Sequence, residues 1–224
     1  MKTSIPLSPW KRHVAKWQHC TSCTLCETRS KVVLARGDLP CEVLFVGEAP
    51  GKSEDILGSP FIGPAGQLFD KLIARAESDY GKTKRKAFTN LVACVPLGER
   101  VKVNMPEASE IRACRNRLIE FVNIAQPRLI VHVGKLANQY AIRGSEVNWQ
   151  SWPSWKNYTG TKRLFFADII HPSAILQANA VSQETEGRRT ISKLIDAYSI
   201  LDEKEIDVDR HIAAGVFSDE DIPY

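Results

Sequence analysis

Short apolar runs alternate with stretches of helical periodicity along most of this 224-residue chain. Four apolar runs end at Gly, Pro or polar residues and predict buried strands over 42–47, 87–95, 128–133 and 164–170. Apolar residues at three- and four-residue spacing predict helices over about 65–78, 104–125, 135–142 and 185–200. Strands that alternate with helices favour a parallel sheet with helices on both faces. The pattern therefore predicts an α/β fold, a three-layer α/β/α sandwich around a central four-stranded, mainly parallel sheet.

The composition, 43% hydrophobic and 25% charged residues, is typical of a globular protein with a buried core. No apolar run approaches the roughly 18 residues of a membrane helix, and the N-terminus lacks the apolar segment of a secretory signal. We therefore expect a cytoplasmic protein with no membrane association.

Charge is distributed unevenly along the chain. Residues 1–201 carry a formal net charge of +10, whereas residues 202–224 carry −6. A basic body suits a polyanionic partner, although many enzymes of this charge do not bind nucleic acid. We predict that residues 1–201, including an N-terminal cysteine segment, form one domain and that residues 202–224 form a flexible acidic tail.

The cysteines are candidate metal ligands. The chain has six of them: Cys20, Cys23, Cys26, Cys41, Cys94 and Cys114. In a reducing cytosol they are not expected to form disulfides, and two thiolates separated by two residues can bind one metal or cluster. Cys94 and Cys114 are the natural distant partners of the N-terminal group, and Cys41 is a sixth candidate. The spacing leaves open a zinc site, an iron–sulfur cluster and reduced thiols without metal.

Three loops, each inside or just after the end of a predicted strand, carry the other candidate chemistry. They are residues 47–51 (Gly-Glu-Ala-Pro-Gly, with Phe61 further along), residues 89–90 (Thr-Asn) and residues 171–176 (His-Pro-Ser-Ala-Ile-Leu). In parallel sheets such loops converge at one edge. An amide can recognise a donor/acceptor edge, an aromatic ring can stack on a planar group, and a histidine can donate to a developing oxyanion. The loops therefore predict a pocket for a heterocycle.

The sequence of these loops resembles that of the family 4 uracil-DNA glycosylases, iron–sulfur members of the uracil-DNA glycosylase superfamily. The resemblance covers roughly residues 18–200, with the specific matches in residues 47–66, 89–90 and 171–174. It implies a uracil-DNA glycosylase-like fold and a monofunctional enzyme of base excision repair. Such an enzyme flips uracil out of single- or double-stranded DNA and hydrolyses its N-glycosidic bond, leaving an abasic site.

The resemblance implies roles for the residues that perform the reaction. His171 would stabilise negative charge on the uracil O2 as the glycosidic bond breaks, and Glu48 would position or activate the attacking water. Ile175 and Leu176 would form an apolar wedge that enters the space vacated by the flipped base.

The same resemblance implies a set of substrate-binding residues. Phe61 would stack on the extruded base, and Asn90 would hydrogen-bond the base edge that distinguishes uracil from cytosine. Gly47 and Ala49 would also belong to the substrate-binding set, with the Ala49 backbone helping Glu48 to position the attacking water, and Glu54 would crowd a thymine methyl group.

The family's ligand pattern implies a [4Fe-4S] cluster in preference to zinc, held by Cys20, Cys23, Cys94 and Cys114. The remaining two cysteines would be spare thiols. The cluster would have a structural role, tying the N-terminal segment to the helix that carries Cys114.

Two features keep alternatives open. The segment 95–105 lacks the family's usual sequence, and Gln177 stands where an arginine often follows the His-Pro loop. A catalytically weak DNA-binding module of the same fold and a glycosylase for another deaminated base, such as hypoxanthine, are therefore alternatives. The aromatic cluster over 149–158 either stacks on exposed bases or packs as a surface loop.

The C-terminus carries a separate signal. Its last eight residues, from Phe217 to Tyr224 (Phe-Ser-Asp-Glu-Asp-Ile-Pro-Tyr), resemble the acidic tip of bacterial single-stranded-DNA-binding proteins. This resemblance implies docking onto replication or repair proteins that recognise such tips. A tail that competes for the chain's own DNA-binding face and a simple disordered end are the alternatives. For the body we expect a monomer.

Overall fold

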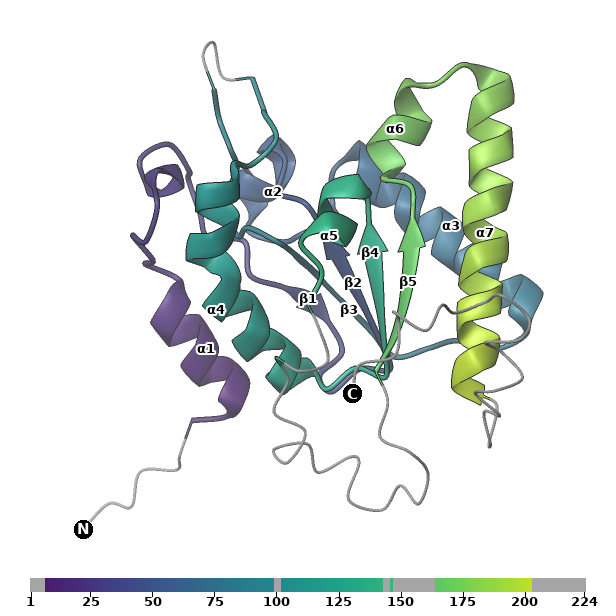
Figure 1. The fold of residues 1–224 in the computed structure, drawn as a ribbon, viewed down its shortest axis with the longest axis horizontal. Coiled ribbons are helices and arrows are strands. Elements are labelled where there is room, and N and C mark those ends of the chain that lie inside the picture. The colour runs from purple at the N-terminus through teal and green to yellow at the C-terminus, as the bar shows by residue number, and fades with distance from the viewer. Residues whose placement is uncertain (1–6, 99–101, 143–145, 147–163, 203–224) are drawn as a thin grey trace.

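The computed structural model describes residues 7–98, 102–142, 146 and 164–202, and its core is one sheet of five strands (Figure 1). In chain order the strands are β1 (Arg36–Gly37), β2 (Val43–Gly47), β3 (Lys86–Asn90), β4 (Leu129–Val133) and β5 (Phe165–Ile169). The spatial order is β1-β3-β2-β4-β5, with β1 antiparallel to β3 and the other pairs parallel. The predicted α/β fold is confirmed, with one difference. The two residues of β1 are too few to give a periodic signal, so the sheet has five strands instead of four.

Helices cover both faces of the sheet (Figure 1). One face carries α1 (Pro9–Trp17), α4 (Ala108–Ala125) and α5 (Lys135–Gln139), and the other carries α3 (Pro64–Tyr80), α6 (Pro172–Gln177) and α7 (Ala180–Asp202). A short 3-10 helix, η1 (Thr24–Cys26), follows α1, and α2 (Lys52–Leu57) lies between β2 and α3. In the described part, no helix is long and apolar enough to cross a membrane.

The alternation of side chains along β2 explains the two buried layers. Val43 and Phe45 belong to the core formed with α3 and α7, whereas Leu44 and Val46 belong to the core formed with α4. All five residues of β2 and all five of β4 are buried. Central parallel strands are buried on both faces, which is why they are continuous apolar runs in the sequence.

The structure shifts several predicted boundaries. The strand predicted over 87–95 ends at Asn90, and the helix predicted from 104 begins at Ala108, with Glu107 as its N-cap. The N–H of Glu107 donates to Oε2 of Glu110 at 2.7 Å, which closes a capping box. The last helix is longer than predicted and ends at Asp202. The aromatic cluster over 149–158 and the tail tip over 217–224 lie outside the described residues.

Candidate active site

The candidate site lies at the carboxyl edge of the sheet, where four parallel strands end. Gly47 ends β2, Asn90 ends β3, Gly134 follows β4, and His171 comes two residues after the end of β5. Gly47 and Asn90 are paired in the register of β2 and β3, so the sheet itself places them side by side. The predicted convergence of the three loops at one edge is therefore present.

Gly47 lies where the amide of Asn90 meets the ring of Phe61. A Cβ at Gly47 would lie 2.4 Å from Oδ1 of Asn90 and 2.5 Å from Cζ of Phe61, closer than real Cβ contacts allow. Asn90 is 3% exposed and Phe61 is 7% exposed. A glycine is therefore required for an amide and an aromatic ring to meet at the end of β2.

The backbone at Phe61 is held in an unusual conformation. Its φ of 56° lies in the left-handed region, which non-glycine residues seldom adopt. Arg36 on β1 donates to the carbonyls of Pro60 and Phe61, at 2.8 and 3.2 Å, and its guanidinium lies over the ring of Phe88. Gly66 lies against Phe61, since a Cβ there would be 2.1 Å from the Phe61 carbonyl carbon. Strained residues kept in place by several contacts are frequent in ligand sites.

Glu54 organises the loop that carries Phe61. Its carboxylate accepts backbone N–H bonds from Gly51, Ile62 and Gly63, at 3.1, 2.9 and 2.7 Å. The side chain is 9% exposed. The structure therefore places Glu54 in the interior of the loop, which differs from the role beside a thymine methyl group expected from the sequence.

Glu48 and His171 approach each other around Gly134. A Cβ on Gly134 would lie 2.5 Å from Oε1 of Glu48 and 3.1 Å from Cβ of His171, and the φ of Gly134 is +102°. Oε1 of Glu48 accepts the N–H of Leu136 at 3.1 Å. Burial raises the pKa of the Glu48 carboxyl, and the bond from Leu136 opposes that rise. Ala49 is half-buried next to Glu48.

His171 is held in one tautomer by Ser173. Nδ1 of His171 accepts the backbone N–H of Ser173 at 3.2 Å and lies 2.7 Å from its hydroxyl oxygen. Because Nδ1 accepts, the proton of the neutral ring is on Nε2, which is free to donate elsewhere. Burial lowers the pKa of His171, while the charge of Glu54 raises it. The result is a neutral imidazole with an Nε2–H donor.

The two residues expected to form the wedge differ in exposure. Leu176 is 41% exposed, whereas Ile175 is 2% exposed and lies in the interior. Consecutive residues of a helix point in different directions, and α6 contacts both α3 and α7. The expected wedge role stays a prediction for Leu176, whose side chain is available for insertion, whereas Ile175 is buried in the described structure.

The four cysteines expected to bind a cluster lie within electrostatic reach of one another. Burial raises the pKa of Cys94 to about 12, with further contributions from Cys114, Cys23 and Cys20, while the charge of Arg29 lowers it. Burial likewise raises the pKa of Cys23, to which Cys114 and Cys20 add. All six cysteines are free thiols. Within the described ranges, no three His, Cys, Asp or Glu side chains are already arranged as ligands of one metal ion.

Several residues that shape the site are not indicated as such by the sequence. Gly134 marks only the end of a predicted strand, and Ser173 is one residue of the His-Pro-Ser loop. Arg36 and Arg117 were not singled out, because charged residues at polar positions of a periodic pattern are ordinarily expected on the surface. A glycine directly after a buried strand was the one available signal for Gly134.

Comparison with known proteins agrees with the geometry of the site. The family model of the uracil DNA glycosylase superfamily matches residues 35–194. The type-4 uracil-DNA glycosylase of Saccharolobus solfataricus is 34% identical over 165 residues, which are 70% of this chain and 72% of the relative. That of Pyrobaculum aerophilum is 36% identical over 173 residues (75% and 84%), and that of Thermotoga maritima is 30% identical over 197 residues (83% and 91%). By both measures, the family match and these relatives, the chain belongs to the uracil DNA glycosylase superfamily.

Proposed function

We propose that this chain is a monofunctional uracil-DNA glycosylase that hydrolyses the N-glycosidic bond of deoxyuridine in DNA. The observation that carries the proposal is the meeting of Asn90 and Phe61 at Gly47, with Glu48 and His171 on either side of Gly134. An amide, a ring, a neutral imidazole and a half-buried carboxylate form the set of groups that this hydrolysis needs. The relatives named as type-4 uracil-DNA glycosylases favour uracil over another deaminated base.

The groups around Gly47 recognise the base. The ring of Phe61 stacks on the flipped base, and the amide of Asn90 pairs with the edge that differs between uracil and cytosine. Gly47 leaves room for both, and the Ala49 backbone helps Glu48 to position the attacking water. A site built to hydrogen-bond one edge rejects an analogue with the wrong pattern strongly, because its buried polar groups are left unpaired.

His171 assists the breaking of the glycosidic bond, and Glu48 activates the attacking water. The C1′–N1 bond breaks with oxocarbenium character, and the bonding electrons leave with the uracil anion. Nε2–H of His171 donates to the developing charge on uracil O2, an interaction whose removal costs about 10²–10³ in comparable oxyanion sites. Glu48 accepts a proton from the water whose oxygen adds to C1′, which leaves an abasic sugar, and the departing uracil anion takes up a proton from solvent to become free uracil.

Leu176 assists the extrusion of the base from the DNA stack. Removing a paired base from the stack costs a few kcal/mol, less in single strands and mismatches. The exposed side chain of Leu176 can fill the vacated space. We therefore expect uracil in single strands or mispairs to be removed at least as fast as uracil paired with adenine.

We further propose that Cys20, Cys23, Cys94 and Cys114 hold a [4Fe-4S] cluster. Four soft sulfur donors suit this group, and the proposal is supported by the electrostatic influence of Cys20 and Cys114 on both Cys23 and Cys94. The positive charge next to Cys94, from Arg29, suits four thiolates; Arg29 also donates to the Cys20 carbonyl at 2.6 Å. When bound, the cluster supplies a structural cross-link and takes no part in the hydrolysis.

Oligonucleotides carrying one labelled deoxyuridine, single-stranded or paired with G or A, test the proposed activity. Strand breakage only after alkali, and only at uracil, is the expected result. Parallel oligonucleotides with hypoxanthine, thymine and cytosine define the base range. Binding without cleavage by iron-loaded protein would instead support a DNA-binding module, and cleavage at hypoxanthine alone would support the other glycosylase.

We also propose that the acidic tip over 217–224 docks onto proteins that recognise the tips of single-stranded-DNA-binding proteins, and that the body is a monomer. In support, α7 ends at Asp202, at the edge of the sheet opposite the candidate site (Figure 1). A tail that starts there can hold a protein while the site holds DNA. Deletion of residues 217–224 should abolish binding to such partners without changing uracil excision. Unchanged binding would contradict the docking proposal, and light scattering tests the monomer.

A further inference from the structure

Arg117 on α4 is a buried cation whose partners are neutral oxygen atoms. It is 1% exposed, and its guanidinium donates to Oγ1 of Thr89 at 2.8 Å and to the carbonyls of Asn90 and Leu91. Among the described residues its Nε has no hydrogen-bond partner, and it forms no ion pair. Burying a guanidinium without a carboxylate partner costs desolvation free energy, so we expect Arg117 to have a specific role in this position.

The contacts of Arg117 fix the peptide that carries Asn90. The carbonyl of Asn90 receives the guanidinium, while the next N–H, that of Leu91, donates to the Gly47 carbonyl at 2.8 Å. The same peptide group is therefore held on opposite sides by α4 and by β2. Thr89, the residue before, is also anchored, since its hydroxyl donates to the Leu34 carbonyl at 2.7 Å. The direction of the Asn90 side chain follows from this backbone.

The hydrogen bonds of Arg117 also connect the segment that carries Asn90 with the segments that carry Cys94 and Cys114. Cys114 lies three residues before Arg117, on the same side of α4. Cys94 lies four residues after Asn90, on the segment that leaves β3. Arg117 therefore holds together the two segments that carry these cysteines: helix α4 and the residues that follow β3.

We propose that Arg117 is a positioning residue for uracil recognition, which acts by holding the Asn90 amide against Gly47 and Phe61. This inference rests on the proposed function. Arg117 does not touch the base; its effect passes through the Asn90 backbone. An arginine suits this position because its fork of donors reaches three oxygens from one side chain, which a lysine cannot do.

A double-mutant cycle between Arg117→Met and Asn90→Ala tests the proposal. In otherwise wild-type protein, Arg117→Met should lower kcat/KM for uracil excision by about 10- to 100-fold, since small displacements of a positioned group have effects of that size. In the Asn90→Ala background the same change should alter kcat/KM by about twofold or less, because the two residues act as one unit. Arg117→Lys should restore part of the loss. Binding to DNA that already contains an abasic site should be unchanged, because that ligand has no base to recognise.

The matched control is Arg115→Met on the same helix. Arg115 also makes several hydrogen bonds, to the carbonyls of Tyr140 and Ala141 and to Glu146, but none leads to Asn90. All rates are compared below the melting temperature of the least stable variant, at equal iron content. Equal losses from Arg117→Met in both backgrounds, or no loss in wild type, would overturn the inference. A wild-type protein that does not excise uracil would overturn the proposed function instead.

Discussion

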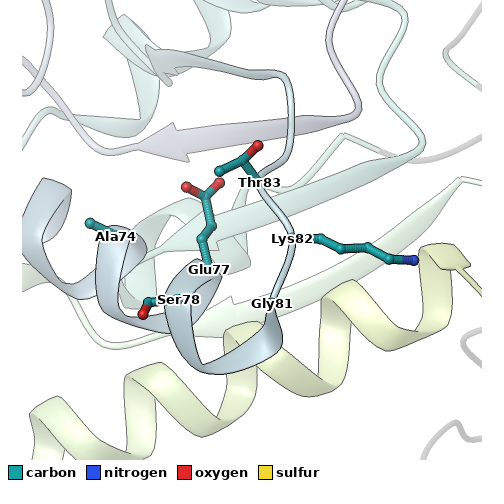
Figure 2. Close-up of a pocket in the computed structure, with 6 residues that line it drawn as sticks. All are labelled: Ala74, Glu77, Ser78, Gly81, Lys82 and Thr83. Atoms are coloured by element: carbon teal, nitrogen blue, oxygen red, sulfur yellow. The ribbon is translucent and has the colours of Figure 1, made fainter.

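Charges at the amino edge of the sheet are paired with one another. The Asp202 carboxylate, at the end of α7, accepts from Lys82 at 2.9 Å, Lys84 at 2.5 Å and the Tyr80 hydroxyl at 2.8 Å. Burial alone would raise its pKa, but these three bonds hold the pKa well below the usual range. Figure 2 shows Glu77 rising from α3 toward Thr83, where it accepts the backbone N–H of Lys84 at 3.0 Å.

This amino edge also carries a surface depression, yet it holds none of the proposed catalytic groups. The depression is lined by Ala74, Glu77, Ser78, Gly81, Lys82 and Thr83 (Figure 2). Its charged groups take part in ion pairs that join α7 to the loop after α3, through Asp202 with Lys82 and Lys84, and β3 to α3, through Lys86 with Glu77. We assign this edge a role in stability.

At the carboxyl edge the ionisable groups of the candidate site differ from those at the amino edge, because in the described part of the chain they lack ion-pair partners of opposite charge. Among the described residues Glu48 has one hydrogen bond and no cationic partner, and burial raises its pKa. Burial also lowers the pKa of His171, and two nearby residues, Phe61 and Gly134, have positive φ. Unpaired groups whose pKa values are shifted so that the neutral form is favoured are frequent at catalytic sites, whereas charges paired with each other more often stabilise the fold. The two ends of one sheet therefore serve separate purposes, stability at the amino edge and chemistry at the carboxyl edge.

The largest expected effect comes from Glu48→Gln, which removes the base but keeps the shape. Single-turnover uracil excision should fall by about 10²–10⁴-fold. The folded-state pKa of Glu48 is raised above its unfolded value, so the ionised group costs stability at neutral pH. The variant should therefore unfold at the same or a higher temperature than wild type. A large loss of stability together with activity would place Glu48 among structural residues and break the comparison.

Gly47→Ala should have the next largest effect. Its Cβ would press on Oδ1 of Asn90 and Cζ of Phe61, so one of the two must move. We expect about a 100-fold fall in kcat/KM for uracil, with unchanged binding to abasic DNA. Pre-steady-state kinetics and fluorescence anisotropy measure the two quantities. Full activity in this variant would mean that Asn90 and Phe61 do not form the base pocket.

The pH profile should report the shifted groups at the carboxyl edge. Excision needs ionised Glu48, so the rate should fall tenfold per pH unit below the pKa of Glu48, which lies above its ordinary value of 4.5. In Glu48→Gln this acid limb should disappear. A wild-type limb at or below pH 4.5 would contradict the assignment.

Asp202→Asn should have the smallest effect on catalysis. Loss of the charge leaves Lys84 buried without its carboxylate, which should lower the free energy of unfolding by about 1–3 kcal/mol at pH 7. Because the folded-state pKa of Asp202 is depressed, its stabilisation is present at neutral pH and is lost as the pH falls through that pKa. Uracil excision by the folded variant should equal that of wild type. Urea denaturation and the oligonucleotide assay check both statements.

The sequence predicted the layers and the position of the site because both depend on simple rules. Buried parallel strands such as β2 and β4 are continuous apolar runs, and their carboxyl ends gather the loops. Glu48, Asn90 and His171 could thus be expected at one edge before any coordinates were known. The two-residue strand β1 and the short helices α2 and α6 left no periodic signal.

What could not be predicted depends on contacts between distant segments. Burial of Ile175 follows from how α6 rests on α3 and α7, and the loop role of Glu54 follows from the path of the Phe61 backbone. Arg117 follows Arg115 and Asn116 in a polar stretch of α4, so its sequence position gives no sign that it reaches the end of β3. Such contacts are set by tertiary packing, which periodicity does not describe.

One comparison of two proteins can decide whether this pocket hydrolyses deoxyuridine. Wild-type protein and the Asn90→Ala/His171→Ala double variant are incubated with an oligonucleotide containing one deoxyuridine, and free base and DNA are analysed by mass spectrometry. We expect one free uracil per intact abasic strand with wild type and a severe loss with the double variant. No free uracil from wild type, or equal release by both proteins, would contradict it.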